Sequence, residues 1–148
     1  MKTIFDRITR EELITRIKTL NDNSLAQWGS MNVCQMLKHC ILADELYLGR
    51  RHHKRVFLGL LIGKFALRHL LKNDDPMGKN APTSDDFKIK EMDGDVSFEK
   101  EKWISVIEAY GSFSNLDFVH WFFGKMTKEQ IGHLVYKHTD HHLRQFKA

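Results

Sequence analysis

The chain has 148 residues, of which 42% are hydrophobic and 28% charged, and its formal net charge at pH 7 is +4. This length suits one domain with one sizeable core, so we expect a single domain over residues 1–148, and the charge is too small to indicate a nucleic-acid partner. No stretch reaches the roughly 18 apolar residues of a membrane span and the N-terminus lacks a signal-peptide run, so we expect a cytoplasmic protein without a transmembrane segment.

Three stretches carry the signature of a helix N-terminus, which is a capping residue followed three positions later by glutamate or glutamine. The capping residues are Thr9, Asn32 and Thr127, and the residues that follow them are Glu12, Gln35 and Gln130. Each stretch leads into apolar residues with the period of a helix, so we expect helices at roughly 9–20, 32–49 and 127–146.

Two further segments have helical character. The segment 56–71 is strongly apolar, and 97–110 places Trp103, Val106, Ile107 and Tyr110 on one face. Residues 72–95 are rich in turn formers and charge, so we expect a long irregular connection there. No pair of segments shows strand alternation. The pattern predicts an all-α fold, a four-helix bundle in which a long crossover between the second and third main helices carries the extra 56–71 helix.

Histidines are concentrated in the last predicted helix, at His133, His138, His141 and His142. On a wheel stepped at about 100° per residue, His138 and His142 fall at the centre of the apolar stripe. His141 falls at its edge and His133 on the solvent side. The spacing of four between His138 and His142 stacks two imidazoles one turn apart, so one helix can present both to a single metal ion.

The second predicted helix also directs a histidine inward, because His39 follows Met36 by three positions and precedes Ala43 by four. A buried imidazole without a hydrogen-bond partner is costly, and three that converge can satisfy one another by sharing a metal. Three neutral histidines leave a coordination position open, as catalytic sites do. The alternative is that His138 and His142 are hydrogen-bonded core histidines or half-exposed ones, because a spacing of four alone is a weak signal.

The run from His138 to Gln145 resembles the HxxHHxxQ motif in the last helix of DinB/YfiT-like proteins. Residues 28–39 are similar to the stretch that leads to the helix-two histidine of that superfamily, and 120–130 resembles a subfamily of unknown function. The resemblance covers nearly the whole chain. It implies a four-helix bundle, often a homodimer, in which His39, His138 and His142 hold a metal. The usual HRGQ ending reads HLRQ here.

The resemblance further implies a small-molecule substrate, and some relatives use a low-molecular-weight thiol for transfer or isomerisation. We expect a divalent metal ion as cofactor, zinc or nickel, although imidazole also suits copper and iron. Such an ion lowers the pKa of bound water to give hydroxide, or binds a thiol as thiolate. Hydrolysis and thiol transfer therefore both stay open, and no catalytic residue is assigned.

Other sources of catalysis are less well supported by the sequence. It contains no GxSxG elbow, P-loop or GxGxxG motif. Cys40 follows His39 directly, so on a helix the two side chains point about 100° apart and we expect no Cys–His pair. His120 and the aromatic residues 121–123 either line a pocket or form a plug that packs the preceding loop onto the bundle.

A competing hypothesis concerns residues 50–71, where a basic run at 50–55 precedes the apolar segment. Together they can form a surface anchor for anionic membranes, although Lys64, Arg68 and His69 interrupt the apolar run. A solvated charge run, followed by a helix that packs on the bundle or at a dimer interface, is favoured over the anchor. The second hypothesis is thus a non-catalytic helical binding module that contacts a membrane surface or a protein partner. Nucleic-acid binding is not expected, because no aromatic residue interleaves the basic run.

Overall fold

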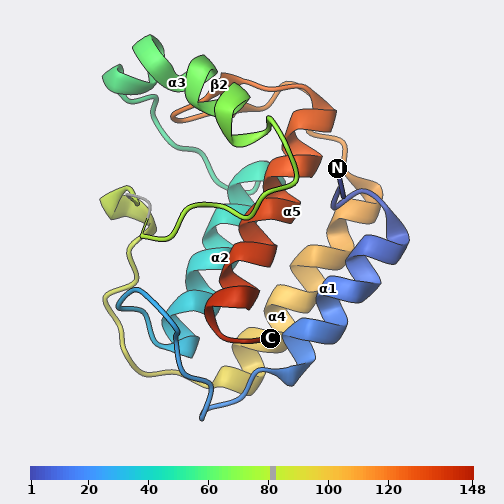
Figure 1. The fold of residues 1–148 in the computed structure, drawn as a ribbon, viewed down its shortest axis with the longest axis vertical. Coiled ribbons are helices and arrows are strands. Elements are labelled where there is room, and N and C mark those ends of the chain that lie inside the picture. Colours follow the sequence, from blue (N-terminus) through green and yellow to red (C-terminus); the bar gives the residue numbers. More distant parts are fainter. Residues whose placement is uncertain (81–82) are drawn as a thin grey trace.

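A computed structural model describes residues 1–80 and 83–148, and its main elements are helices (Figure 1). The α-helices are α1 (Arg7–Thr19), α2 (Val33–Tyr47), α3 (Phe57–Leu70), α4 (Val96–Ala109) and α5 (Lys128–Gln145). Shorter elements are the 3-10 helices η1 (Asp85–Phe87) and η2 (Tyr110–Ser112) and the antiparallel strands β1 (Val119–His120) and β2 (Gly124–Lys125). The expected mainly helical fold is confirmed, and the small hairpin was not expected.

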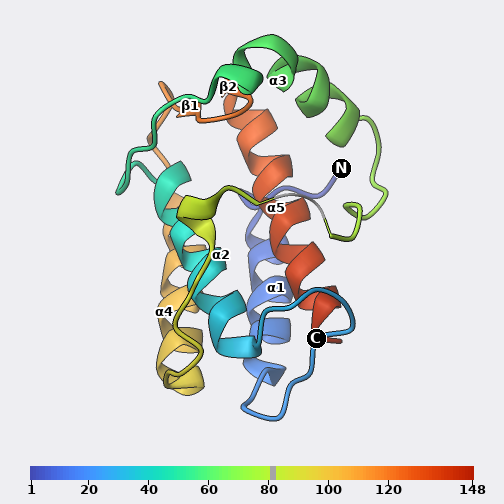
Figure 2. The same ribbon diagram turned by 90° about the vertical axis from the view of Figure 1, so that its left-hand side faces the viewer.

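Helices α1, α2, α4 and α5 enclose the core. α2 contacts α4 and α5, and α1 contacts the same two helices from the other side. Figures 1 and 2 show these four helices running side by side along the long axis of the molecule. The face predicted for the fourth of the five helices is confirmed, because the core includes its apolar residues Trp103, Val106, Ile107 and Tyr110.

Two of the three predicted helix starts are confirmed. Asn32 and Thr127 cap α2 and α5, and both form the reciprocal capping box. The first predicted helix is present, but its predicted start is wrong, because α1 begins at Arg7 and its cap is Asp6. The Asp6 carboxylate accepts hydrogen bonds from the Thr9 backbone N–H at 2.8 Å and from the Thr9 hydroxyl at 2.9 Å. Aspartate is as good a capping residue as threonine, so the helix can begin about one turn earlier, after Asp6 rather than after Thr9.

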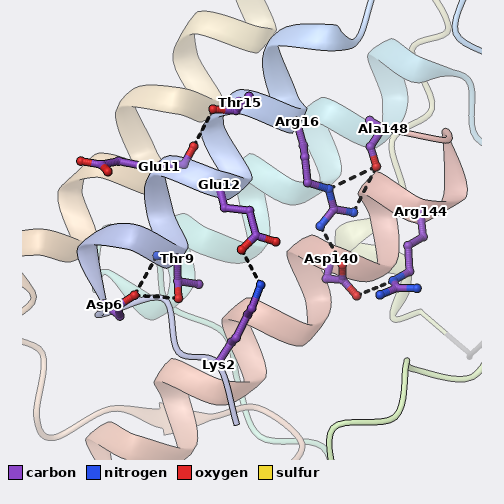
Figure 3. Close-up of polar contacts among 10 residues, drawn as sticks. All are labelled: Lys2, Asp6, Thr9, Glu11, Glu12, Thr15, Arg16, Asp140, Arg144 and Ala148. Atoms are coloured by element: carbon purple, nitrogen blue, oxygen red, sulfur yellow. Dashed lines mark hydrogen bonds and ion pairs between the residues drawn. The ribbon is translucent and has the colours of Figure 1, made fainter.

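Helix α5 is buried on more than its apolar stripe. Lys137 and Asp140 are each only 6% exposed, although the wheel places them away from the stripe. Lys137 Nζ donates to the backbone carbonyls of Leu70 and Asn73, both at 2.9 Å. On another side of the helix, Asp140 accepts from Arg16 of α1 at 2.7 Å (Figure 3). The polar face of α5 is therefore covered by α1 and by the chain that follows α3.

Helix α3 lies in the connection between α2 and α4, as expected, and packs on the hairpin at one end of the molecule (Figure 2). Its glycines Gly59 and Gly63 face the hairpin. A Cβ atom at either position would lie within 3.0 Å of the Phe122 carbonyl oxygen. Within residues 1–80 and 83–148, none of the helices combines the length and the apolar character that crossing a membrane requires.

The close approach of α3 to the hairpin yields a stability prediction. We expect Gly63→Ala to lower the free energy of unfolding by about 1–3 kcal/mol, because its methyl group would press on backbone atoms that cannot rotate away. Gly78→Ala is the control, since nothing lies within 4 Å of a Cβ atom there. Urea unfolding, with hydrogen exchange of the α3 amides, measures the effect. Equal stability of the two variants would contradict the packing described for α3.

Candidate metal centre

Three histidine side chains from two helices meet between α2 and α5. The Nε2 atom of His138 lies 3.3 Å from Nε2 of His39 and 3.2 Å from Nε2 of His142. All three ligand atoms lie within 4.8 Å of one another. The structure thus brings together the three histidines that the sequence singles out as metal ligands.

The spacing of these nitrogens can be compared with that of a metal site. A zinc–nitrogen bond is about 2.0–2.1 Å long, so two nitrogens on one tetrahedral ion are about 3.4 Å apart. The distances from His138 to His39 and His142, 3.3 and 3.2 Å, are close to this value. The three atoms therefore surround a space that suits a single ion.

Hydrogen bonds at the far side of two rings fix which nitrogen carries the proton. Nδ1 of His39 lies 2.9 Å from the Phe87 carbonyl oxygen, which can only accept, so this nitrogen donates. Nδ1 of His142 lies 2.9 Å from Oε1 of Gln145, and the Gln145 amide N–H donates to the Trp28 carbonyl at 2.7 Å. Both rings consequently direct an unprotonated Nε2 towards His138, which is the second-shell arrangement typical of metal ligands.

One proton cannot satisfy this cluster. With the Nδ1 atoms of His39 and His142 protonated, the only proton available between the three Nε2 atoms is one on His138, and it can point directly at only one neighbour. The remaining lone pair is then buried without a donor, which is costly. A divalent cation would satisfy all three lone pairs together, so the residues present fit a metal ion.

The protonation state of the rings also suits a metal. Burial lowers the pKa of His39, and it lowers that of His138 well below the ordinary range. Burial, with the nearby His39 as a smaller cause, lowers the pKa of His142 to about 3. All three rings are therefore neutral near pH 7, and a neutral imidazole is the form that binds metals.

The cluster offers three ligands. In the part of the chain that the structure describes, no further histidine, cysteine, aspartate or glutamate joins it. Cys40 is buried and its sulfur lies 3.7 Å from that of Met36, so it forms no pair with His39, as expected. Three protein ligands leave a fourth position of a tetrahedral ion open, which is the arrangement of catalytic rather than structural zinc sites.

The other histidines of α5 lie outside the cluster. His141 is half-buried and its ring meets the edge of Trp28 at 5.5 Å between centroids. His133, predicted to face solvent, has a side chain that is only 15% exposed. Its Nδ1 atom lies 3.0 Å from the Lys2 carbonyl, because the N-terminal segment covers this part of the helix.

His120 forms an aromatic plug, which is one of the two roles considered for it. Its buried ring accepts backbone N–H bonds at Nδ1 from Phe122 at 3.0 Å and Phe123 at 3.1 Å. The ring stacks on Phe123 and Trp121, with centroids 4.6 and 5.3 Å away. It lies near enough to His138 for a charge on it to contribute to the lowered pKa of that residue. The His120 ring therefore holds the turn of the hairpin and lies close to the cluster.

The backbone of the connection before α4 is the feature that the sequence does not reveal. Its carbonyl groups accept hydrogen bonds from four side chains of α2 and its cap. The pairs are Asn32 with Met92, Gln35 with Ile89, Lys38 with Asp93, and His39 with Phe87. This docking holds the Phe87 carbonyl against His39. Carbonyl groups occur at every position and leave no signal in a sequence.

A sequence model of one protein family matches residues 6–148, and the family is described as "Protein of unknown function (DUF1569)". The match spans nearly the whole chain and includes the three clustered histidines. Neither the curated proteins nor the solved structures include one that matches this chain.

Buried titratable groups make stability depend on pH. Burial lowers the pKa of both His120 and His142 to about 3, whereas that of a histidine in an unfolded chain is about 6.5. Between these values the unfolded chain binds more protons, so stability is lost as the pH falls. Asp44 acts in the opposite sense, because burial raises its pKa to about 7 despite hydrogen bonds from Trp103 and Tyr110. One carboxyl group offsets only part of the effect of several histidines.

We therefore expect the free energy of unfolding of the metal-free protein to fall as the pH drops from 6.5 to 5, by about 1.4 kcal/mol per pH unit for each buried histidine at most. His120→Asn should make this slope shallower, because the Asn side-chain oxygen can still accept the two backbone N–H bonds but does not titrate. The control is His52→Asn, at an exposed position. Urea unfolding at several pH values measures the slope, and stability that rises on acidification would contradict the assignment.

Proposed function

We propose that this chain, which belongs to the DUF1569 family of proteins of unknown function, is a metal-dependent enzyme that acts on a small molecule. The observation that carries the proposal is the convergence of His39, His138 and His142. Their Nε2 atoms face one another while two of the Nδ1 protons are held by protein acceptors. Such rings are preorganised for an ion, whereas hydrogen bonding among the three rings alone leaves one Nε2 lone pair without a donor.

We also propose that the fold is the four-helix bundle of DinB/YfiT-like proteins. The side-by-side packing of α1, α2, α4 and α5 supports this assignment. So does the origin of the three histidines, one from α2 and two from α5, which is the distribution that the resemblance implies. Fold alone does not determine an activity, so the site is the basis for the function.

The chemistry proposed depends on groups that this chain supplies. A divalent ion, zinc or nickel, would act at this site as a Lewis acid that lowers the pKa of a water molecule or a thiol at the open position. The Phe87 carbonyl and the Gln145 amide hold the Nδ1 protons of His39 and His142, which keeps the ligand rings oriented. Burial keeps the rings neutral. Hydrolysis and thiol transfer are the two reactions that this arrangement favours.

Metal analysis is the first test of the proposal. Untagged protein purified without chelator should contain about one divalent ion per chain, and His138→Ala should contain little, because the central ligand is lost. His133→Ala is the matched control on the same helix, and it should retain the ion. Elemental analysis by mass spectrometry measures the content. Absence of metal in every sample, even after reconstitution with zinc and nickel, would contradict the proposal.

Activity is tested separately from metal content. Metal-loaded protein is incubated either with a low-molecular-weight thiol and an electrophile, or with hydrolysable esters and amides. We expect turnover of one class, which is lost in His138→Ala and kept in His133→Ala. A protein that binds one ion tightly but converts neither class would retain the metal centre and contradict the enzymatic role.

The Gln145 contact predicts a second-shell effect. Gln145→Met removes the acceptor of the His142 Nδ1 proton with little change in volume, so we expect the affinity for zinc to fall about 10–100-fold. The control is Gln27→Met, because this exposed side chain lies on the loop that contacts Gln145 and makes no bond to a ligand ring. Competition with a chromophoric chelator measures both affinities. Equal affinities would show that Gln145 does not orient His142.

A further inference from the structure

Helix α3 carries an apolar face that no other part of the described chain covers. Six large apolar side chains within nine residues are between 45% and 75% exposed: Phe57, Leu58, Leu60, Leu61, Ile62 and Phe65. We refer to these six as the apolar face of α3. Contiguous exposed surfaces of this kind are uncommon in monomeric proteins and usually mark a contact with a partner or a membrane.

The orientation of α3 is fixed by the side of the helix that is buried. Gly59 and Gly63 bear on the backbone of Phe122, so this side has no room for a larger residue. The Val56 N–H donates to the Trp121 carbonyl at 3.1 Å, and the Lys64 ammonium donates to the Lys125 carbonyl. The helix therefore buries its smallest residues and directs its largest apolar residues outward. Rotation of α3 to bury the apolar face would disrupt all of these contacts.

Basic residues precede, interrupt and follow the apolar face in the sequence. From residue 46 to residue 73 the sequence contains no aspartate or glutamate, and it contains seven basic residues: Arg50, Arg51, Lys54, Arg55, Lys64, Arg68 and Lys72. In the described residues, only Arg51 among these seven pairs with a carboxylate, that of Glu45. The surface thus combines exposed apolar side chains with cations that have no acidic partner.

We propose that the apolar face of α3 and the basic residues between positions 50 and 72 bind the surface of an anionic lipid bilayer. An anionic bilayer matches both parts of this surface. Its negative headgroups attract the basic residues, and the boundary of its acyl region accepts apolar side chains to a depth of about 5–10 Å. A second copy of the chain would bring the same cations together, which is unfavourable. α3 also lies at one end of the molecule in both views (Figures 1 and 2), where a flat surface can reach it. The proposal does not depend on the metal centre.

Cosedimentation with vesicles tests the proposal on the full chain. We expect binding to vesicles that contain about one third phosphatidylserine and little binding to vesicles of pure phosphatidylcholine. Binding should weaken as the salt concentration rises from 0.05 to 0.5 M, because salt screens the attraction between the basic residues and the headgroups.

Two variants separate the charged and apolar contributions, and each has a matched control at exposed positions elsewhere. Neutralising three cations should lower the partition coefficient on the order of 100-fold. This variant is Arg50→Gln, Lys54→Gln and Arg68→Gln, and its control is Lys90→Gln, Lys102→Gln and Lys147→Gln. Removing two apolar side chains should lower the partition coefficient about tenfold or more. This variant is Leu61→Gln with Phe65→Gln, and its control is Leu116→Gln with Phe98→Gln.

Several results would overturn the proposal. They are absence of binding to anionic vesicles at low salt, equal binding to neutral vesicles, and equal loss in a variant and its control. Sedimentation velocity without lipid can give a further result that would overturn the proposal. A dimer that Leu61→Gln with Phe65→Gln converts to a monomer, in a protein that does not bind vesicles, would assign the apolar face to self-association instead.

Discussion

The arrangement of this molecule depends on three neutral imidazoles packed against one another, of which those of His39 and His142 are buried and that of His138 is half-buried. Each ring has two nitrogens that must be satisfied, and the core around them supplies few partners. His39 obtains its partner from Phe87 in the connection before α4. His142 obtains its partner from Gln145, whose amide is held in turn by the Trp28 carbonyl in the loop before α2. The connection before α4 and the loop before α2 therefore do more than join helices, because they determine where the ring protons lie.

The positions of the three histidines could be predicted from the sequence because they depend only on helical periodicity. His39, His138 and His142 each lie three or four residues from apolar neighbours, and the helices formed as that pattern indicates. The roles of Phe87 and Gln145 could not be predicted in this way. The Gln145 side chain donates to Trp28, 117 residues earlier, and such a pairing depends on how separate segments meet.

Errors in the predicted elements have similar physical origins. Asp6 and Thr9 are both good capping residues, and local sequence does not decide between them until the turn before the helix is placed. The hairpin has strands of two residues each, too short to show alternation. The helical wheel places His133 on the solvent side, yet its Nδ1 atom lies 3.0 Å from the Lys2 carbonyl oxygen of the N-terminal segment. In each case the outcome depends on contacts that a periodic pattern does not record.

In the proposed function, the histidine cluster connects metal binding to folding. Below about pH 6.5 the metal-free native state keeps several imidazoles neutral that an unfolded chain would protonate, and this lowers its stability. An ion that binds only the native state adds stability by mass action, in proportion to the logarithm of its concentration over the dissociation constant. The contact of His39 with the Phe87 carbonyl extends this effect to the connection before α4, whose backbone is held by α2 side chains. One ligand ring of the cluster is thus held in place by a segment that carries no ligand itself.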